Sequence, residues 1–293
     1  MGALYVIGNG FDLHFGLATR TCDFFEYLEE QSIFDEVENA LEVLHCYGVD
    51  WHEYEQSLND IDLDEIENQN EIYPDYLSDH ESDRDDGITN MQMYVDSISD
   101  AICSALNQMV LNANEKAEEL RGDYYNETLF KAGDAILSFN YTSTIEYLFH
   151  VPKAVPIFHI HGKYEQGDSL IFGYRKNSKS YSHAWYSQDD DFDYYIGQQR
   201  EIVYDFYQSW EKKLQINSLD AFLNQCHRVN QIIVLGHSMS AVDSEYMEQI
   251  EKIIAPDTWK ISIYQQDDID RIRGQNYSFE NKIEYIRMED VII

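Results

Sequence analysis

The sequence predicts an α/β fold with a mostly parallel sheet flanked by helices. Short runs of apolar residues alternate along the chain with segments whose apolar residues recur at helical spacing, an order typical of parallel sheets. Several of the apolar runs end in glycine, asparagine or histidine. Because ligands of such sheets bind beyond the carboxyl ends of the strands, we expect a binding site at these ends.

The first expected element is a buried strand over residues 3–8, which runs into a glycine pair, Gly8 and Gly10. A dinucleotide-binding fingerprint would need a third glycine where Leu13 stands, and we expect a long loop over residues 8–20 before any helix. The two glycines lack a Cβ and can bring the backbone close to a ligand, or they can simply end the strand.

A helical region is expected to follow this loop. Thr21 can cap a helix over Cys22–Glu30. Residues 31–130 contain no convincing strand and show helical spacing, so we expect a helical insertion within a single α/β domain that spans residues 1–293. The acidic stretch from Asp60 to Asp86 is expected to be a solvated loop at the surface of this insertion.

Further apolar runs predict strands in the second half of the chain. They are AILSFN (135–140), PIFHIHG (156–162), SLIFGY (169–174), QIIVLGHS (231–238), WKISIYQ (259–265) and IEYIRMEDVII (283–293). Residues 175–228, which are rich in Tyr and Asp, are expected to be mainly helical.

Composition narrows the classes of function. The net charge of -35 repels the phosphates of nucleic acids and anionic lipid headgroups, so neither nucleic acid nor membrane is an expected partner. No apolar run long enough for a membrane span and no secretory signal is visible. The four cysteines are widely spaced, so we expect reduced thiols and a cytoplasmic protein. The acidic surface keeps the protein soluble, mimics nucleic acid or docks a basic partner.

Polar residues at the expected strand ends are the candidate functional groups. Asn140 offers an amide that donates and accepts, which suits a water or a sugar hydroxyl, although asparagine is also common in turns. His161, directly before Gly162, suits acid–base chemistry or polar contact with a ligand. His159 lies on the same strand face, but no cysteine or carboxylate pattern completes a metal site. We therefore expect no metal and a structural role for His159.

The segment GHSMS (236–240) resembles the nucleophile elbow G-x-S-x-G, with Ser240 in place of the last glycine. A hydrolase of that class needs a histidine after the serine, and no histidine follows Ser238. We therefore expect Ser238 to be a hydrogen-bonding group at a strand end, or a plain turn residue.

Five segments resemble, in order along the chain, the AbiH-type abortive infection family of bacterial phage-defence proteins. They are IGNGFDLHFGLATRTCDF (7–24), WHEYEQSL (51–58), ILSFNYTSTIEYLF (136–149), IHGKYEQGDSLIFGY (160–174) and VLGHSMSAVDSEYMEQI (234–250). That family is similar to sirtuin-like NAD-binding domains, so the resemblance implies a Rossmannoid sheet.

The resemblance also implies roles for individual residues. Asn140 would position an attacking water, and His161 would be the catalytic histidine. The residues expected to contact the nucleotide are Gly8, Asn9, Gly10, Phe11, Asp12, Ser138, Tyr141, Gly236, His237 and Ser238.

Two positions depart from the sirtuin-like pattern. Such loops usually carry serine where Asp12 stands and proline where Ala18 stands. Asp12 could bind a ribose diol, or it could repel a diphosphate. No zinc-binding cysteine set is present, so protein deacetylation is not expected.

The function implied by the resemblance is phage defence by a hydrolase that takes NAD as its substrate and depletes it. Two alternatives remain open: a nucleotide-binding sensor that signals or docks a partner without turnover, and a hydrolase acting on another nucleotide-like substrate. Assembly with a second copy of the chain or with a partner defence protein also stays open.

Overall fold

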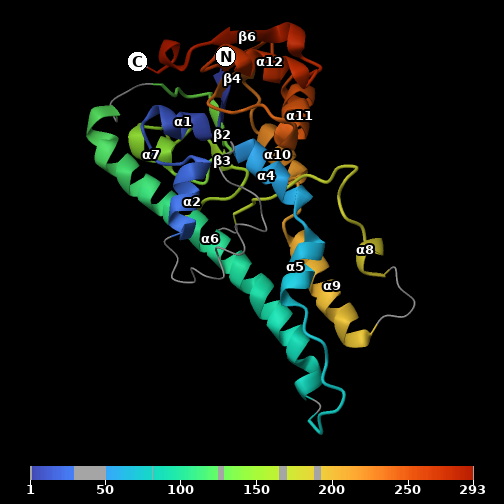
Figure 1. Ribbon diagram of the computed structural model, residues 1–293. Coiled ribbons are helices and arrows are strands. Elements are labelled where there is room, and N and C mark those ends of the chain that lie inside the picture. The colour runs from blue at the N-terminus through green and yellow to red at the C-terminus, as the bar shows by residue number, and fades with distance from the viewer. Residues whose placement is uncertain are drawn as a thin grey trace. The chain divides into compact units, whose positions relative to one another are not determined.

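The computed structural model describes residues 2–29, 51–80, 82–124, 129–164, 170–187 and 193–292. The chain divides into two compact units, whose elements are labelled in Figure 1. The sheet unit comprises residues 1–20, 108–171 and 213–293, and the helical unit comprises residues 21–107 and 172–212. Each unit is described by itself.

The sheet unit contains a six-stranded sheet with the order β3-β2-β1-β4-β5-β6, in which all neighbouring strands are parallel. The strands are β1 (Gly2–Ile7), β2 (Ala135–Ser138), β3 (Ile157–His159), β4 (Val229–Leu235), β5 (Thr258–Ser262) and β6 (Ile283–Ile286). This is the strand order of a doubly wound Rossmann-type sheet, in which the winding reverses between β1 and β4. The predicted α/β fold is therefore confirmed.

Both faces of this sheet are covered, because alternate residues of each strand point to opposite sides. Leu4 and Val6 pack into one core, whereas Tyr5 and Ile7 pack into the other. Helices α10 (Ile216–Leu223), α11 (Ser244–Ile254) and α12 (Gln266–Gly274) contribute to the first core. Helices α1 (Asn9–His14), α7 (Thr144–Leu148) and the sheet unit's part of α6 (Ser82–Tyr124) contribute to the second. The described part of the unit also contains the short 3-10 helices η3 (Ala241–Asp243), η4 (Glu280–Lys282) and η5 (Met288–Asp290).

The expected loop over residues 8–20 is wrong in its first part, because helix α1 begins at Asn9, directly after β1. Gly8 is extended, with φ −128° and ψ 179°, and precedes the first helical residue. The side chain of Phe11 is fully buried in the second core. Burial of this aromatic ring stabilises a helix too short to form by itself.

The strand expected over residues 169–174 is also wrong. Among its described residues, Tyr174 forms only an isolated bridge, with Glu211. Gly173 has φ +141°, a conformation that strands do not use. The strand expected over 283–293 ends at Ile286, and η5 follows it.

The helical unit contains α2 (Thr21–Glu29), α4 (Trp51–Ser57), η1 (Leu58–Asp60), α5 (Leu63–Asn70), residues 82–107 of α6, α8 (Ala184–Ser187) and α9 (Tyr194–Ser209). The helix expected from Thr21 is confirmed. Residues 31–50, 81 and 125–128 of the expected insertion lie outside the described residues, and its described part is largely helical.

The acidic stretch from Asp60 to Asp86 is only partly the expected loop, because α5 lies within it. Asp62 caps this helix by accepting a hydrogen bond from the backbone N–H of Glu65 at 3.1 Å. Leu63 and Ile66 are buried. Two well-spaced apolar side chains and an N-cap therefore suffice for a helix in an acidic segment.

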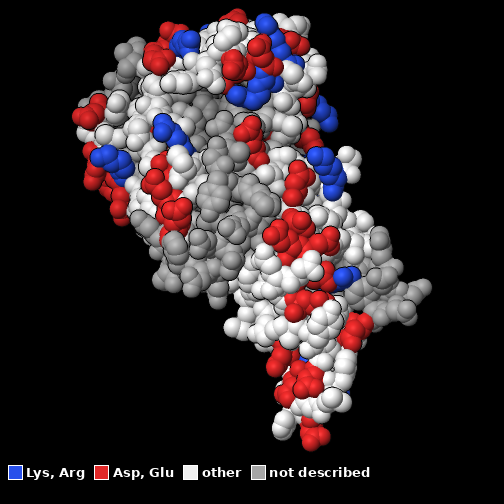
Figure 2. All heavy atoms as spheres, in the orientation of Figure 1, with Lys and Arg blue, Asp and Glu red and all other residues white. Residues whose placement is uncertain are grey.

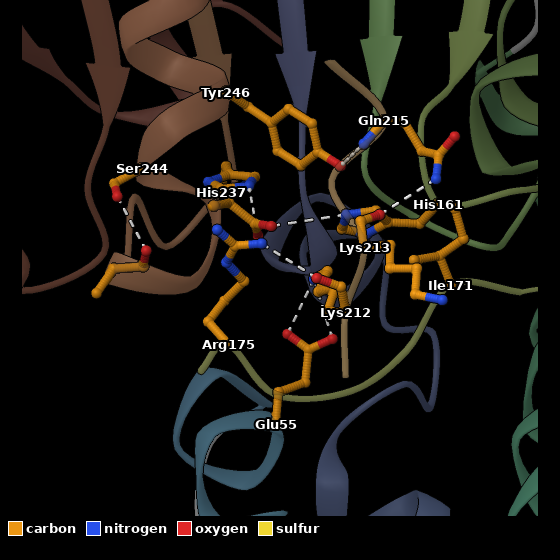
Figure 3. A network of polar contacts seen from close by, with 12 residues as sticks. Glu55, His161, Ile171, Arg175, Lys212, Lys213, Gln215, His237, Ser244 and Tyr246 are labelled. Carbon is orange, nitrogen blue, oxygen red and sulfur yellow. Dashed lines mark hydrogen bonds and ion pairs between the residues drawn. The ribbon is translucent and has the colours of Figure 1, made fainter. Parts of the chain in front are cut away.

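A buried ion pair lies in the core of the helical unit. The ammonium group of Lys212 donates to both carboxylate oxygens of Glu55, at 3.1 and 3.2 Å, as Figure 3 shows. The carbonyl of Lys212 accepts from the Arg175 guanidinium at 3.1 Å. Nearby, Tyr174 stacks on Tyr207 with ring centroids 4.8 Å apart.

No helix within the described ranges combines the length and the apolar character that a membrane span needs. The cysteines found in those ranges, Cys22, Cys103 and Cys226, are all free thiols.

Candidate functional site

The carboxyl ends of four strands meet at one edge of the sheet. Ile7 of β1 lies beside Ser138 of β2 and Leu235 of β4, and Ser138 lies beside His159 of β3. The residues that follow these strand ends therefore come together, as the sequence predicts. They are Gly8, Asn140, His161 and Gly236.

The glycines at this edge allow two backbone turns to touch. A Cβ on Gly8 would lie 2.5 Å from the Cα of His237. A Cβ on Gly236, whose φ is +68°, would lie 2.1 Å from the backbone nitrogen of Phe11. Both distances are far below van der Waals contact, so no side chain fits at either position. The turn after β1 and the turn after β4 thus pack directly together at the point where the winding reverses.

The backbone N–H groups in the turn after β1 donate hydrogen bonds to carbonyls of the protein itself. Gly8 donates to the carbonyl of Leu235 at 3.0 Å, Gly10 to that of Gly236 at 2.8 Å, and Phe11 to that of Gly8 at 2.9 Å. A phosphate cradle needs such N–H groups to point at the ligand. These three groups therefore do not form one in this structure.

Asn140 is fixed by the first turn and by its own strand. Its amide nitrogen donates to the carbonyl of Gly8 at 3.1 Å, and its backbone N–H donates to the Ser138 hydroxyl at 3.2 Å. Ser138 is fully buried and Asn140 is nearly so. The side-chain amide of Asn140 is thus held in one orientation just after the carboxyl end of β2.

The two histidines of the FHIHG segment contact different carboxylates. Nδ1 of His159 donates to the carbonyl of Asn140 at 3.0 Å, and its Nε2 lies 3.1 Å from Glu146. Lys163 also bonds Glu146, at 3.0 Å. Although burial opposes it, the interactions with His159 and Lys163 lower the pKa of the Glu146 carboxyl to about 2. His159 thus has partners on both ring nitrogens, as expected of a structural histidine.

His161 belongs to a second cluster, formed with His237 and Asp243. Nε2 of His161 lies 3.6 Å from Oδ1 of Asp243, and Nε2 of His237 lies 3.6 Å from Oδ2 of the same carboxylate. All three side chains are at most 10% exposed. One carboxylate therefore faces both imidazoles. Figure 3 shows His161 and His237 with Tyr246 beside them.

Aromatic rings enclose this cluster. The ring of Phe139 meets the imidazoles of His161 and His237 edge to face, with centroids 5.2 and 4.3 Å away. Tyr246 lies 6.1 Å from His161, and its hydroxyl accepts from the backbone N–H of Gln215 at 2.8 Å. Rings on these sides lower the local dielectric and strengthen the electrostatic interactions of the cluster.

The hydrogen bonding of His237 assigns its tautomer. Its Nδ1 accepts from the backbone N–H of Met239 at 3.0 Å, so the ring proton is on Nε2, facing Asp243. Met239 holds φ at +55°, which is uncommon for a residue with a side chain. The turn after β4 is thus shaped to aim this imidazole at the carboxylate.

Asp12 lies inside the protein, in helix α1. It is 1% exposed, and the hydroxyl of Thr142 donates to its Oδ2 at 2.7 Å. Burial raises the pKa of this carboxyl to about 6, against the hydrogen bonds of Thr142 and Thr144. The acidic group of the first turn therefore packs against the segment after β2.

The remaining sequence-predicted contact residues are distributed around the edge. The amide of Asn9 donates to the carbonyl of Thr19 at 2.9 Å, and the hydroxyl of Tyr141 donates to the carbonyl of Ile171 at 2.9 Å. Ser238 is half-buried, and its carbonyl accepts from the Arg271 guanidinium at 3.1 Å.

Asp243 is the functional candidate that sequence reasoning missed. It lies five residues after Ser238, within the segment VLGHSMSAVDSEYMEQI. The signal was available, because an acid that follows a strand-end histidine by a few residues can return to it through a short turn. The 3-10 helix η3, which ends at Asp243, makes that return.

One family model matches most of the chain. It is described as Bacteriophage abortive infection AbiH, and it covers residues 4–265. The match includes Asn140, His161, His237 and Asp243. Among proteins with curated descriptions, none matches the chain. The chain therefore belongs to the AbiH family of bacteriophage abortive infection proteins.

Proposed function

We propose that this AbiH-family protein binds NAD at the sheet edge and hydrolyses it during phage infection, so that the infected cell loses its NAD. The observation that carries the proposal is the cluster of His161, His237 and Asp243, with Asn140 anchored on Gly8 at the same end of the sheet. It lies at the carboxyl edge of a doubly wound sheet, where the strand order reverses, and this is where dinucleotides bind in such sheets.

The proposed reaction consumes one water and one NAD and yields nicotinamide, ADP-ribose and a proton. The bond between the ribose C1 and the nicotinamide ring nitrogen breaks, and its electron pair stays on that nitrogen and cancels the ring's positive charge. The water oxygen forms the new bond to C1. Because the leaving group departs neutral, the protein has to supply a base and a positioned water, but no acid for the leaving group.

Asn140 would orient the water. Its amide nitrogen is anchored on the carbonyl of Gly8, and an amide oxygen accepts hydrogen bonds. A group held on the end of a strand keeps its position well, and catalysis by orientation depends on such positioning.

His161 would take the proton that the water releases, or bind a ribose hydroxyl. Asp243, 3.6 Å from its Nε2, would orient the ring and stabilise the imidazolium that forms. In catalytic triads, a carboxylate likewise orients the histidine that acts as the base and stabilises its imidazolium form. Asp243 is therefore a positioning residue in the proposal.

The rest of the nucleotide would be recognised by its sugar and base. The N–H groups of Gly8, Gly10 and Phe11 are taken by the protein itself, which argues against a phosphate cradle. The turn at Gly236, His237 and Ser238 would contact the adenosine half, as the likeness to sirtuin-like domains suggests.

A direct assay tests the proposal. The purified protein is incubated with NAD, and NAD, nicotinamide and ADP-ribose are separated by chromatography. The proposal requires nicotinamide and ADP-ribose to appear in equal amounts as NAD disappears. Binding of NAD without any loss would favour the sensor function instead, and cleavage of a different nucleotide would favour the other hydrolase.

A further inference from the structure

A group of exposed apolar side chains lies on the helical unit. We call it the docking patch, and it consists of Ile72, Tyr73, Tyr76, Leu77 and Tyr194. Leu77 is 96% exposed and Tyr73 is 75% exposed. The first four residues lie in the segment between α5 and α6, and Tyr194 is the first residue of α9. Exposed apolar groups that gather in one place mark interaction surfaces.

The backbone that carries the docking patch is held in place. The buried amide of Gln199 accepts from the N–H of Ile72 at 3.1 Å and donates to its carbonyl at 2.9 Å. Gly87 of α6 permits this approach, because a Cβ there would lie 2.6 Å from both the Ile72 carbonyl and the Gln199 amide. The segment is therefore pinned against α6 and α9, and its exposed side chains are displayed by an ordered backbone.

Further contacts fix the aromatic part of the docking patch. The hydroxyl of Tyr76 donates to Asp193, and its ring meets that of Tyr195 with centroids 6.0 Å apart. Tyr194 in turn meets Tyr195, with centroids 5.3 Å apart. A preorganised surface loses little conformational entropy when a partner binds.

Acidic side chains surround the docking patch. Residues 71–86 contain seven Asp and Glu residues and one arginine. Asp75, Asp79, Asp85 and Asp86 are exposed, and Figure 2 shows acidic side chains gathered around this end of the helical unit. The patch thus combines apolar contact area with a strong negative field.

This charge decides between the kinds of partner. Nucleic acids and anionic membranes carry the same sign and are repelled. A second copy of this chain, with its net charge of -35, is repelled for the same reason. A basic protein segment is attracted, and its Lys and Arg side chains can also stack on exposed tyrosine rings. We propose that the docking patch binds a basic protein segment in which Lys or Arg alternates with apolar side chains.

Two synthetic peptides of equal charge test the proposal. One alternates Arg with Leu and the other alternates Arg with Ser, and each carries a fluorophore. Binding to the full chain is measured by fluorescence anisotropy at 0.15 M salt. The Arg–Leu peptide should bind at least about tenfold more tightly than the Arg–Ser peptide, and hydrogen exchange within residues 71–80 should slow only when the Arg–Leu peptide is present.

A double variant of the docking patch and a control variant distinguish binding at the patch from attraction by the acidic surface as a whole. The double variant Tyr73→Ser/Leu77→Ser should bind the Arg–Leu peptide no better than the Arg–Ser peptide. The control Tyr264→Ser removes a tyrosine that is 89% exposed on the sheet unit, and it should retain the parental affinity. Both sets of side chains are exposed, so the variants should melt at the parental temperature.

Several results would overturn the proposal. Equal affinity for the two peptides would reduce the patch to a general acidic surface, and parental affinity in the double variant would place the binding elsewhere. If ultracentrifugation shows a dimer that the double variant loses, the occupant is a second copy. If anionic vesicles bind the parent and not the double variant, the occupant is a membrane.

Discussion

Oδ1 of Asp243 lies 3.6 Å from Nε2 of His161, and both side chains are at least nine-tenths buried. The other oxygen of the same carboxylate lies equally far from Nε2 of His237. Because a buried carboxylate interacts strongly with the groups that it faces, Asp243 couples the positions of two imidazoles that arrive from different strands. A substitution at Asp243 should therefore affect both imidazoles of the cluster at once.

Replacement of Asp243 by Asn keeps the shape of the side chain and removes its charge. We expect kcat for NAD hydrolysis to fall by at least about tenfold, with little change in KM, because the orientation and stabilisation of His161 are lost in the reaction step. Steady-state kinetics measures both constants. The control Glu284→Gln removes an exposed acid from β6 and should match the parent. Parental kcat in Asp243→Asn would show that the carboxylate does not assist His161.

Replacement of Gly236 by Ala tests the contact between the turns after β1 and β4. The new Cβ would lie 2.1 Å from a backbone atom, at a residue with φ +68°, so we expect a loss of at least about 2 kcal/mol in unfolding free energy. The control is Gly274→Ala in α12, where a Cβ meets nothing within 4 Å; it should stay within about 1 kcal/mol of the parent. Equal stability of the two variants in urea unfolding would contradict the close packing of these turns.

Asp12 should make stability depend on pH. Its pKa in the folded protein is about 6 and its ordinary value is 3.8, so the folded state favours the protonated form. The stabilising contribution is complete below pH 4 and is lost as the pH rises through 6. Between pH 4 and 7 the parent should lose up to about 3 kcal/mol relative to Asp12→Asn.

Urea unfolding at several pH values measures this difference. The control Asp270→Asn alters an exposed acid on α12 and should follow the parent at every pH. If the stability of Asp12→Asn runs parallel to that of the parent from pH 4 to 7, the raised pKa is wrong.

Removing one partner of the buried Glu55–Lys212 ion pair should destabilise the protein strongly, whereas replacing both partners should destabilise it much less. Lys212→Met or Glu55→Gln leaves one buried group without its ionic partner, and we expect each to destabilise the protein by about 3–5 kcal/mol. The double variant Glu55→Gln/Lys212→Met should lose much less than the sum of the two. A double-mutant cycle in urea gives the coupling, and strictly additive losses would mean that the two groups do not interact.

Much of the fold could be predicted because apolar runs carry the signal of buried strands. The core strands β1, β2, β4 and β5 each begin within two residues of the predicted position, since residues buried on both faces leave a continuous apolar run. Helix α1 replaces the start of the expected loop because its stability comes from the burial of Phe11, which six residues of sequence do not reveal. The false strand at 169–174 has the same apolar composition as a true one, and the conformation of Gly173 distinguishes it only in three dimensions.

The candidate site could be predicted in part for a similar reason. Asn140, His161 and Gly236 follow apolar runs, and parallel strands bring such positions to one edge. Asp243 does not itself follow an apolar run and reaches the cluster through a 3-10 helix, so its one sign in the sequence is its position six residues after His237. The glycine pair is compatible with a close approach to a ligand or with a plain strand end, and in the structure Gly8 and Gly10 make room for the turn at Gly236.

The NAD content of infected cells is the most direct measure of NAD hydrolysis by this protein during infection. Cells that express the parent, Asn140→Ala, His161→Ala or the control His227→Ala, which alters an exposed histidine, are infected with a phage that the parent blocks, and NAD is measured over the infection. We expect NAD to fall and protection to hold with the parent and the control. We expect both effects to be lost with Asn140→Ala and His161→Ala, although these variants are present at parental levels and melt at the parental temperature. Protection by the parent while NAD stays constant would contradict NAD hydrolysis as the means of defence.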